Sequence, residues 1–237
     1  MKRLATRILK RLRAGGRPPA PPPPLLSILI LSIPARAERF LVPLLRSLEE
    51  QAGAAGEVEV LTLIDNRSRT IGEKRNALLR MARGRFTAFV DDDDRVADDY
   101  VASILDAIRR QPDRDVICFD VWVRGYHELG YTPAEGMLCR YGIEFENRDL
   151  PEMFTRRPNH LMVFRSALAR SVPFPPTSQG EDTRWAEAMA KRARKQGRIE
   201  KVLYHYDFDV ETSETPASRE WRRRRDQRAG TTNRTEE

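Results

Sequence analysis

The sequence predicts an α/β fold in which a mostly parallel central sheet is flanked by helices. Two near-continuous aliphatic runs of strand length, residues 25–33 and 58–64, are typical of strands buried on both faces. Between and after these runs, apolar residues recur at helical spacing, and such an alternation implies parallel strands joined by crossover helices. With 237 residues, 40% of them hydrophobic, the chain is long enough for one well-buried core.

The elements follow in a regular order through the first half of the chain and a less regular order through the second. Glycines just beyond the helical stripes, such as Gly53 and Gly84, are typical helix ends. We expect strands at residues 25–33, 58–64, 86–90, 116–123, 161–164 and 201–206, and helices at residues 40–51, 73–82, 100–108 and 181–195.

Composition divides the chain into a domain and two tails. Residues 1–24 form a basic and Pro-rich tail, residues 25–212 the domain, and residues 213–237 a polar, Arg-rich tail. The net charge is +7, yet residues 1–27 alone hold seven Lys and Arg without an acid, so the rest of the chain is neutral. We expect the tails either to be simply solvated or to contact an anionic membrane or a nucleic acid peripherally.

Several protein classes are excluded by the sequence. The longest apolar run is shorter than the roughly 20 residues that a membrane-spanning helix needs, so we expect no integral membrane protein. Cys118 and Cys139 have no CxxC or Cys/His spacing, which argues against a disulfide scaffold and a structural zinc site. We therefore expect a cytoplasmic protein, peripheral at most to the inner membrane.

The strongest local signal is the run of four acids, Asp91 to Asp94, at the end of the third strand. Ligands of open α/β sheets bind beyond the carboxyl ends of the strands, where this run lies. An oxygen-rich cluster of this kind favours Mg²⁺ or Mn²⁺ over zinc. The alternative is that these acids only decorate a helix N-terminus, where negative charge is favourable.

Five motifs follow one another along the chain. They are the strand and proline at residues 26–34, Gly-Glu-Lys-Arg-Asn-Ala at 72–77, Ala-Arg-Gly-Arg-Phe at 82–86, the strand and acids at 88–94, and Gly-Glu-Asp at 180–182. This ordered series resembles family 2 glycosyltransferases with the GT-A fold, which are inverting hexosyltransferase-type enzymes dependent on a nucleotide sugar. The resemblance covers roughly residues 25–206, and the order of the motifs makes it more specific than any single one.

The resemblance implies a metal site, a donor site and a catalytic base. Asp91 and Asp93 match the DxD motif, which would hold Mn²⁺ or Mg²⁺ against the diphosphate of the donor, most simply a UDP-sugar. Glu181 and Asp182 match the ED motif, in which the aspartate is the general base. Further donor-binding candidates are Pro34, Arg36, Asp65, Lys74, Arg75 and Asp92.

Two histidines and a further acid complete the expected site. His205, in the Tyr-His-Tyr sequence of the last strand, resembles the C-terminal histidine that some GT-A enzymes add to the metal site, although a strand histidine is more often just packed. His160 and Asp94 are candidates for contact with the sugar or the acceptor, whereas His127 has no such context. The helix-start and turn interpretations of Asp182 and Asp65 remain open alternatives.

The sequence also departs from the family. Pro-Ala-Arg-Ala-Glu at residues 34–38 replaces the usual polar Asn, and Asp-Asn-Arg-Ser at 65–68 replaces the usual Asp-Gly-Ser. These departures fall in the segments expected to contact the base and ribose, whereas the acidic run of the expected metal site keeps the family pattern. The (Q/R)xxRW motif is not evident, which puts processive polysaccharide synthesis in doubt.

Several functions therefore compete. The leading one is transfer of a sugar to a hydroxyl of a glycan or lipid precursor. The alternatives are transfer to hydroxymethylated bases of DNA, with both basic tails on phosphates, a metal-dependent nuclease or nucleotidyltransferase, and a binding protein that keeps the fold without the activity.

Overall fold

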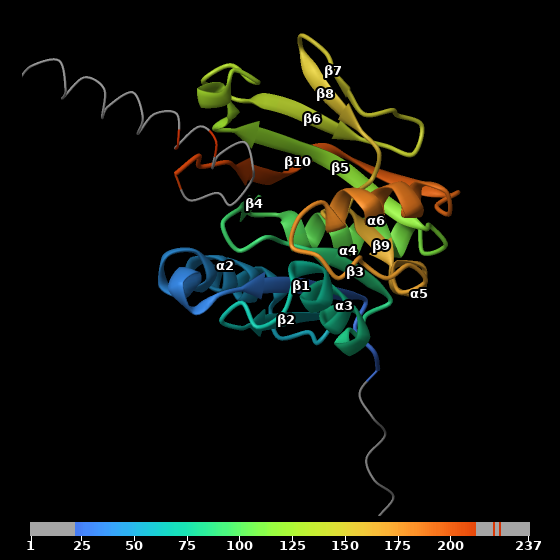
Figure 1. The fold of residues 1–237 in the computed structure, drawn as a ribbon. Coiled ribbons are helices and arrows are strands. Elements are labelled where there is room, and N and C mark those ends of the chain that lie inside the picture. Colours follow the sequence, from blue (N-terminus) through green and yellow to red (C-terminus); the bar gives the residue numbers. More distant parts are fainter. Residues whose placement is uncertain (1–21, 212–219, 221–222, 224–237) are drawn as a thin grey trace, which may run out of the picture.

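The computed structural model describes residues 22–211, 220 and 223, and the elements within them form a mixed α/β structure around one sheet. Its first part is parallel: β1 (Leu26–Ser32) lies between β2 (Val58–Ile64) and β3 (Phe86–Phe89) (Figure 1). The aliphatic residues of β1 are almost all buried, as expected for a strand covered on both faces. The predicted α/β class is confirmed.

The second part of the sheet is built on β5 (Val116–Arg124). β9 (Val163–Arg165) joins it to β3 and is antiparallel to both, while β10 (Gln196–Asp207) runs parallel to β5. The two longest pairings, β1 with β2 and β5 with β10, are parallel. The remaining strands are β4 (Arg95–Val96), β6 (Met137–Tyr141), β7 (Arg148–Asp149) and β8 (Met153–Arg156).

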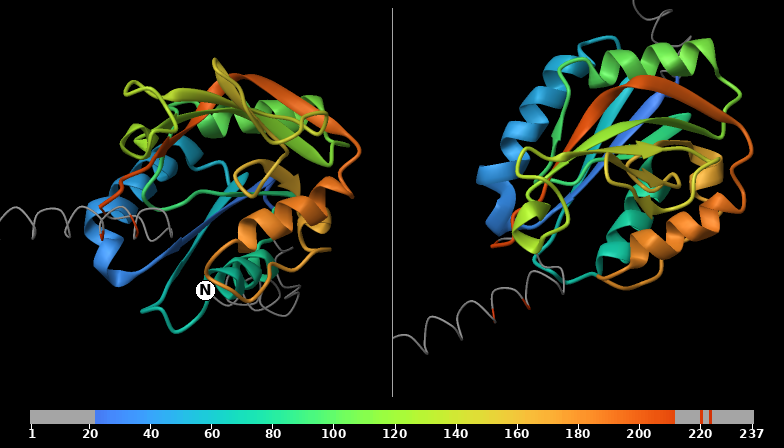
Figure 2. Two further views of the ribbon diagram at one scale, coloured as in Figure 1. Left: turned by 45° about the horizontal axis from the view of Figure 1, so that its top comes forward. Right: turned by 90° about the horizontal axis from the view of Figure 1, so that it is seen from above.

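Helices cover both faces of the sheet. α2 (Val42–Ala52) and α4 (Tyr100–Arg110) pack together on one face, and α3 (Ile71–Met81) and α6 (Glu181–Ala190) on the other (Figure 2). The apolar stripe of α4, including Tyr100, Ile104 and Ile108, is buried, which is why the helical spacing was visible in the sequence. Short helical segments are η1 (Pro34–Arg36), the π-helical η2 (Ala37–Leu41), η3 (Tyr126–Leu129) and α5 (Ser166–Ala169).

The core under α6 is aromatic. Trp185 is buried between Phe164, at 80° to its ring, and Phe174, which stacks on it with ring centroids 4.7 Å apart. The Trp185 indole donates a hydrogen bond to the carbonyl of Val172 at 2.9 Å, so its polar atom is satisfied inside the core. These contacts fix the start of α6 relative to the sheet.

The structure corrects some element boundaries. The helix predicted at residues 73–82 begins at Ile71, because Thr70 and Glu73 form a capping box in which each side chain accepts the other's backbone N–H. The helix predicted at 181–195 ends at Ala190, and the last strand begins at Gln196 instead of residue 201. Most of both predicted tails, residues 1–21 and the bulk of 213–237, lies outside the described residues.

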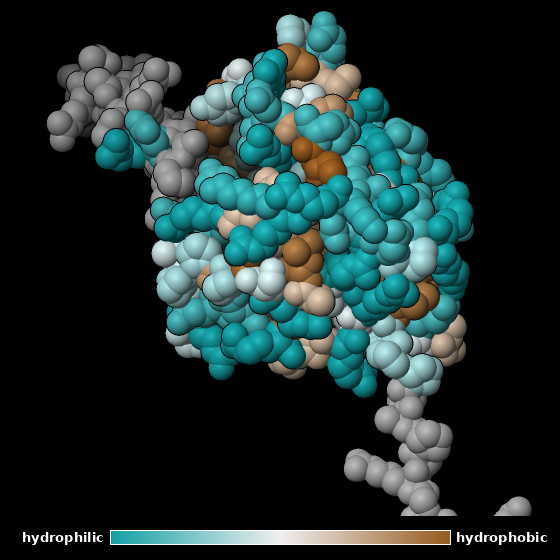
Figure 3. All heavy atoms as spheres, turned by 90° about the vertical axis from the view of Figure 1, so that its right-hand side faces the viewer, coloured by the Kyte–Doolittle hydropathy of each residue, from teal (hydrophilic) through white to brown (hydrophobic). Residues whose placement is uncertain are grey.

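The surface of the described part of the chain is largely polar. In Figure 3, apolar residues are scattered over a hydrophilic face. The large exposed apolar side chains come from separate segments: Val42, Ile64, Met81, Tyr131 and Leu150. Within the described residues, no helix is long and apolar enough to cross a membrane.

Candidate functional site

A cleft opens where the parallel strands end. This strand-end cleft has a volume of about 560 Å³ and is lined from β1 by Ser32, from η1 by Arg36, from α3 by Lys74 and Arg75, and from the acidic run by Asp91, Asp92 and Asp93. The N-terminal residues of α6, Glu181 and Asp182, close it from the opposite side. The sequence-predicted residues from four segments are thereby brought together.

The four acids of the run alternate in exposure. The side chains of Asp91 and Asp93 are 24% and 33% exposed, whereas Asp92, which borders the cleft, and Asp94, which does not, are both buried. Asp92 accepts a hydrogen bond from the Ser32 hydroxyl at 2.5 Å. Burial raises the pKa of Asp92 to about 6, despite the hydrogen bond from Ser32 and the charge of Arg36. The run therefore presents two accessible carboxylates.

Arg36 supplies positive charge to the outer side of the run. Its guanidinium forms ion pairs with Asp92, at 2.9 Å, and with Asp93, and it lies 5.2 Å from the ring centroid of Phe40. Burial raises the pKa of Asp93, although the charge of Arg36 opposes this effect. Arg36 thus offsets part of the repulsion between neighbouring carboxylates.

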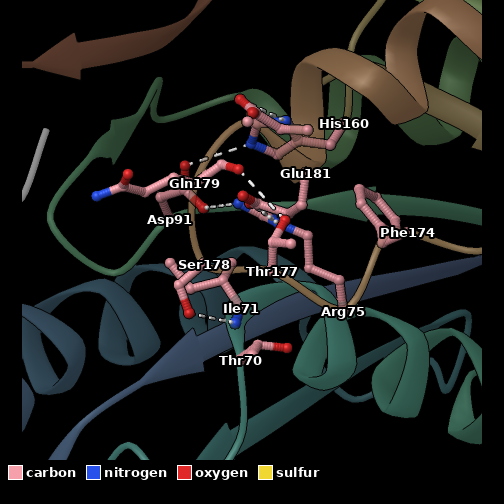
Figure 4. Close-up of polar contacts among 12 residues, drawn as sticks. Thr70, Ile71, Arg75, Asp91, His160, Phe174, Thr177, Ser178, Gln179 and Glu181 are labelled. Atoms are coloured by element: carbon pink, nitrogen blue, oxygen red, sulfur yellow. Dashed lines mark hydrogen bonds and ion pairs between the residues drawn. The ribbon is translucent and has the colours of Figure 1, made fainter. Parts of the chain in front are cut away.

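Arg75 occupies the centre of the site. Its Nη2 donates to Asp91 at 3.1 Å and its Nε lies 3.4 Å from Glu181, with Phe174 nearby (Figure 4). The ring of Phe89 also lies beside the guanidinium. Burial would raise the pKa of Asp91, but Arg75 and His160 beside it hold that pKa well below its usual range. Asp91 is consequently ionised at neutral pH, and α3, β3 and α6 are tied together by one buried cation.

Asp65 and Lys74 form a second polar pair beside the cleft. Asp65 accepts hydrogen bonds from the Ser68 hydroxyl and the Arg69 backbone N–H, both at 3.0 Å, and lies 3.1 Å from the Lys74 ammonium. The loop carries Arg67 at φ 60°, an uncommon conformation for a residue other than glycine. The turn interpretation of Asp65 and a binding role are therefore compatible, and the side chain does not itself line the cleft.

Glu181 and Asp182 have different surroundings. Both follow Gly180, which adopts a left-handed conformation at φ 67°. Glu181 is buried against Arg75, whereas the Asp182 side chain is 38% exposed and accepts the Thr183 backbone N–H at 2.8 Å. Only Asp182 of the two lies free enough to meet a substrate hydroxyl.

A second cavity adjoins the strand-end cleft. This tyrosine pocket has a volume of about 380 Å³ and is lined by Tyr126, Tyr131, Tyr141, Phe154, Arg156, Asn159, His160 and Tyr206 among others. It shares Arg75, Asp91 and Asp182 with the strand-end cleft. None of its aromatic residues was singled out from the sequence, because they come from β5 to β10 without a common motif.

Tyr204 is a further site residue that sequence reasoning missed. Its buried hydroxyl accepts the Asp91 backbone N–H at 3.1 Å and donates to Asp94 at 2.7 Å. Asp94 also accepts the Asp207 backbone N–H and lines neither cavity, so its predicted contact with sugar or acceptor is not supported. Tyr204 and Asp94 instead fix the position of the acidic run.

Two other predicted residues also lie apart from the cleft. His205 pairs in register with Trp122, whereas the adjacent pairs hold Val121, Val123 and Tyr206, which line the tyrosine pocket. Since side chains alternate along strands, His205 points to the other face, away from Asp91 and Asp93. The structure thus does not support His205 as a metal ligand. Pro34 is exposed at the start of η1 and does not line the cleft.

Within residues 22–211, 220 and 223, no group of three or more His, Cys, Asp or Glu side chains is arranged to hold a metal ion. Asp91 and Asp93 nevertheless offer two partly exposed carboxylates on one wall of the cleft. Mg²⁺ in proteins is often bound through one or two carboxylates together with substrate phosphates and water. The residues present therefore fit a divalent ion that arrives with a phosphorylated ligand.

The sheet, the acidic run at the end of a central strand and the facing carboxylate on α6 define the class of protein. The fold is the GT-A fold of nucleotide-sugar-dependent glycosyltransferases. Residues 44–172, more than half of the chain, match the family described as Glycosyl transferase family 2. The chain belongs to this family, which confirms the resemblance found in the sequence.

Solved structures support the fold. It is similar to that of S. aureus TarS 1-349, with a TM-score of 0.58 and 20% identity over 77% of this chain and 60% of that chain. The same TarS fragment in complex with UDP-GlcNAc matches with a TM-score of 0.52 and 16% identity over 81% and 60% of the two chains. The mannosyltransferase PcManGT from Pyrobaculum calidifontis in complex with GDP-Man and Mn²⁺ matches with a TM-score of 0.50 and 15% identity over 85% and 63%.

At these identities the similarity shows the fold alone. The chain spans about 60% of the length of these structural relatives. Comparison with curated protein sequences finds no match.

Proposed function

We propose that the protein transfers a sugar from a nucleotide-sugar donor in the strand-end cleft to a hydroxyl of an acceptor in the tyrosine pocket. The observation that carries this proposal is the junction of the two cavities, which share Arg75, Asp91 and Asp182. A donor and an acceptor bound in adjoining cavities are held for reaction, which removes much of the entropic barrier. The reacting carbon would lie between Asp91 and Asp182.

The donor is proposed to be a UDP-sugar. The relatives with the same fold include complexes of TarS with UDP and UDP-GlcNAc, while PcManGT carries GDP-Man. In this chain, Lys74, paired with Asp65, and Arg36 place positive charge in the cleft where a diphosphate would need it. The candidates for contact with the nucleoside are Arg67, Ser68 and Arg69, which line the cleft in the loop that Asp65 holds in place by its hydrogen bonds.

A divalent cation, Mn²⁺ or Mg²⁺, is proposed to accompany the donor, with Asp91 and Asp93 as its protein ligands. When bound, such an ion would act as a Lewis acid that offsets negative charge on the departing diphosphate. Arg36 already neutralises part of the charge on Asp93, so it would share the carboxylate with the ion or release it. Arg75 keeps the Asp91 carboxylate oriented by a hydrogen bond of 3.1 Å.

Asp182 is proposed to be the general base of an inverting transfer. In a single displacement, a bond forms between the acceptor oxygen and the anomeric carbon while the bond to the diphosphate oxygen breaks on the opposite face. The proton of the acceptor hydroxyl passes to Asp182, and the nucleoside diphosphate leaves. Among the residues shared by the two cavities, Asp182 combines a partly exposed carboxylate with a place across the junction from Asp91.

The acceptor is proposed to be a neutral glycan or the glycan part of a lipid precursor. The tyrosine pocket is rich in aromatic rings, which pack against the apolar faces of sugars. Its charged lining includes Asp149, paired with Arg156, besides Asp91, Asp182 and Arg75, so it has no surplus of positive charge for a polyanion. A DNA acceptor would depend on the basic tails, which lie outside the described residues.

The proposal is tested by donor turnover and transfer. Purified protein is incubated with Mn²⁺ and a panel of UDP- and GDP-sugars, and released nucleoside diphosphate is measured with and without glycan and modified-DNA acceptors. We expect one donor to be turned over and a glycan to be extended. Strand scission or nucleotide addition on DNA, without release of nucleoside diphosphate, would instead favour a nuclease or nucleotidyltransferase.

The role of Asp182 is tested by Asp182→Asn. Loss of a general base lowers the rate by about 10²- to 10⁴-fold, so transfer should nearly cease while donor binding is kept. The matched control is Glu187→Gln, which makes the same change from carboxylate to carboxamide at an exposed position of the same helix and should retain activity. Loss of donor binding in Asp182→Asn, with transfer falling only in proportion, would remove Asp182 from the base role.

A further inference from the structure

His160 lies at the junction of the two cavities and is held rigidly. It is 5% exposed, and its loop between β8 and β9 is fixed by hydrogen bonds from Leu161 and Met162 to Asn159 and from the Phe89 backbone N–H to the His160 carbonyl. The imidazole faces Asp91 (Figure 4) and lies edge-on to the ring of Phe89. Its two nitrogens therefore have defined surroundings.

The two nitrogens differ in their partners. Nε2 lies 3.4 Å from Asp91 Oδ2, and an ionised carboxylate can only accept, so Nε2 carries the hydrogen. In the neutral ring, Nδ1 is then a hydrogen-bond acceptor. Nδ1 is buried and has no hydrogen-bond partner, since the nearest charged group, Asp182 Oδ2, is 3.9 Å away and is itself an acceptor.

A buried acceptor without a donor carries a desolvation cost, which a bound ligand can relieve. The missing partner must be a donor small enough to enter beside Asp182, and it must be compatible with the tyrosine pocket, whose wall includes His160. A sugar hydroxyl meets both conditions. The hydroxyl that reacts gives its proton to Asp182, so the one that pairs with Nδ1 is a neighbouring hydroxyl.

We propose that His160 Nδ1 accepts a hydrogen bond from a non-reacting hydroxyl of a sugar ring at the junction, which makes His160 a specificity-determining residue. The inference rests on the proposed function and adds to it the group by which the substrate is selected. The hydroxyl belongs either to the transferred sugar or to the acceptor sugar, and the chemistry of recognition is the same for both.

The experiment compares substrates that lack one hydroxyl at a time. With the donor that the nucleotide-sugar panel identifies, kcat/KM is measured for its monodeoxy analogues, and separately for monodeoxy analogues of the acceptor. We expect one analogue to lose about 10- to 100-fold, as when a buried acceptor is left without its donor. A loss in the first series assigns the hydroxyl to the transferred sugar, and a loss in the second assigns it to the acceptor.

Two substitutions test whether Nδ1 is the group that makes this distinction. In His160→Asn, an amide oxygen can occupy the place of Nδ1, whereas His160→Gln can replace only Nε2. We expect His160→Asn to keep most of the ratio between kcat/KM for the natural substrate and kcat/KM for the deoxy analogue. In His160→Gln this ratio should fall to about one, because kcat/KM for the natural substrate falls. His127→Gln, at an exposed histidine of η3 that lines neither cavity, is the control and should discriminate as the unmodified protein does.

The outcomes separate this inference from the proposed function. Absence of turnover with every nucleotide sugar overturns both. Turnover in which no deoxy analogue loses more than a fewfold overturns the role of His160 alone, and this result needs no variant to fold. The role is also overturned when His160→Gln folds, as judged by its thermal unfolding, and still discriminates fully.

Discussion

Two fully buried tyrosines allow the hydrogen bonds that support the acidic run to be measured. The hydroxyl of Tyr204 bonds to the Asp91 backbone N–H at 3.1 Å and to the Asp94 carboxylate at 2.7 Å. The hydroxyl of Tyr100, equally buried in α4, has no hydrogen-bond partner. Replacing each by phenylalanine removes one oxygen from a closed environment, and only one of the two replacements breaks hydrogen bonds.

The expected magnitudes differ in size and in sign. A hydrogen bond to a neutral group contributes about 1 kcal/mol and one to a charged group about 1.5–3 kcal/mol. Burial, together with the charges of Asp91 and Asp93, raises the pKa of Asp94 well above its usual value. Tyr204→Phe should therefore lower the free energy of unfolding by about 2–4 kcal/mol, the smaller value applying to a protonated Asp94. Burial, together with the charge of Asp94, raises the pKa of Tyr204 well above its usual value, so the hydroxyl keeps its proton at neutral pH. Tyr100→Phe removes an unsatisfied group and should leave stability unchanged or raise it by up to about 1 kcal/mol.

Urea unfolding at pH 7, followed by the fluorescence of the three tryptophans, measures both variants against the unmodified chain. The reasoning also predicts that donor turnover falls in Tyr204→Phe, because Asp91 loses the bond that positions its backbone. Equal losses of stability in the two variants, with an unchanged dependence of the free energy of unfolding on urea concentration, would contradict this reasoning. They would show that stability depends on the missing oxygen and not on its hydrogen bonds. An unchanged free energy of unfolding in Tyr204→Phe would refute the idea that the hydrogen bonds of Tyr204 support the acidic run.

Two further predictions concern carboxylates. Asp93→Asn should weaken donor binding by about tenfold or more when Mn²⁺ is present and far less when it is chelated, as measured by titration calorimetry. The control, Asp98→Asn at an exposed position, should bind the donor as the unmodified chain does. Equal donor affinities of the two variants, both with and without Mn²⁺, would contradict the metal assignment. Glu59, although burial opposes it, has a lowered pKa because it accepts hydrogen bonds from Ser27, Arg83 and Gly84, so its contribution to stability is present above its unfolded pKa and is lost as the pH falls. Glu59→Gln should therefore cost about 1–3 kcal/mol in urea unfolding at pH 7 and clearly less near pH 4, and a pH-independent difference would refute this account.

The strand ends of the site could be predicted from the sequence because the strands are buried on both faces. Continuous aliphatic runs mark such strands, and the first polar residue after each run marks its carboxyl end. Asp91 follows β3 in this way and Arg36 comes soon after β1, whereas Asp182 lies in the first turn of α6 and faces them across the cleft. The parallel arrangement then brings the carboxyl ends of β1 and β3 to one edge, which is where the structure has the cleft.

The remaining parts depend on pairings between distant segments. The sequence Tyr-His-Tyr at 204–206 shows which residues share a face but not which face meets the cleft, and the register with β5 assigns that face to Tyr204 and Tyr206. Irregularities in this pairing, between Arg198 and Tyr204, shift the alternation. The tyrosine pocket is assembled from several strands and loops, so no local sequence pattern predicts it. The Thr-x-x-Glu sequence at 70–73, by contrast, is a local capping-box signal that would have placed the start of α3 correctly, but the prediction followed the later residues and began the helix at 73.

The position of the acids matters more than their number, because the run is a turn closed by a hydrogen bond of 3.2 Å from the Asp94 backbone N–H to the Asp91 carbonyl. Inserting a single residue between β3 and Asp91 would leave the composition of the segment intact, yet it would move Asp92 and Asp94 away from the hydroxyls of Ser32 and Tyr204 that now anchor them. Among relatives of this chain, a long string of aspartates is thus a poor guide to cation binding unless its distance from the preceding strand is also known.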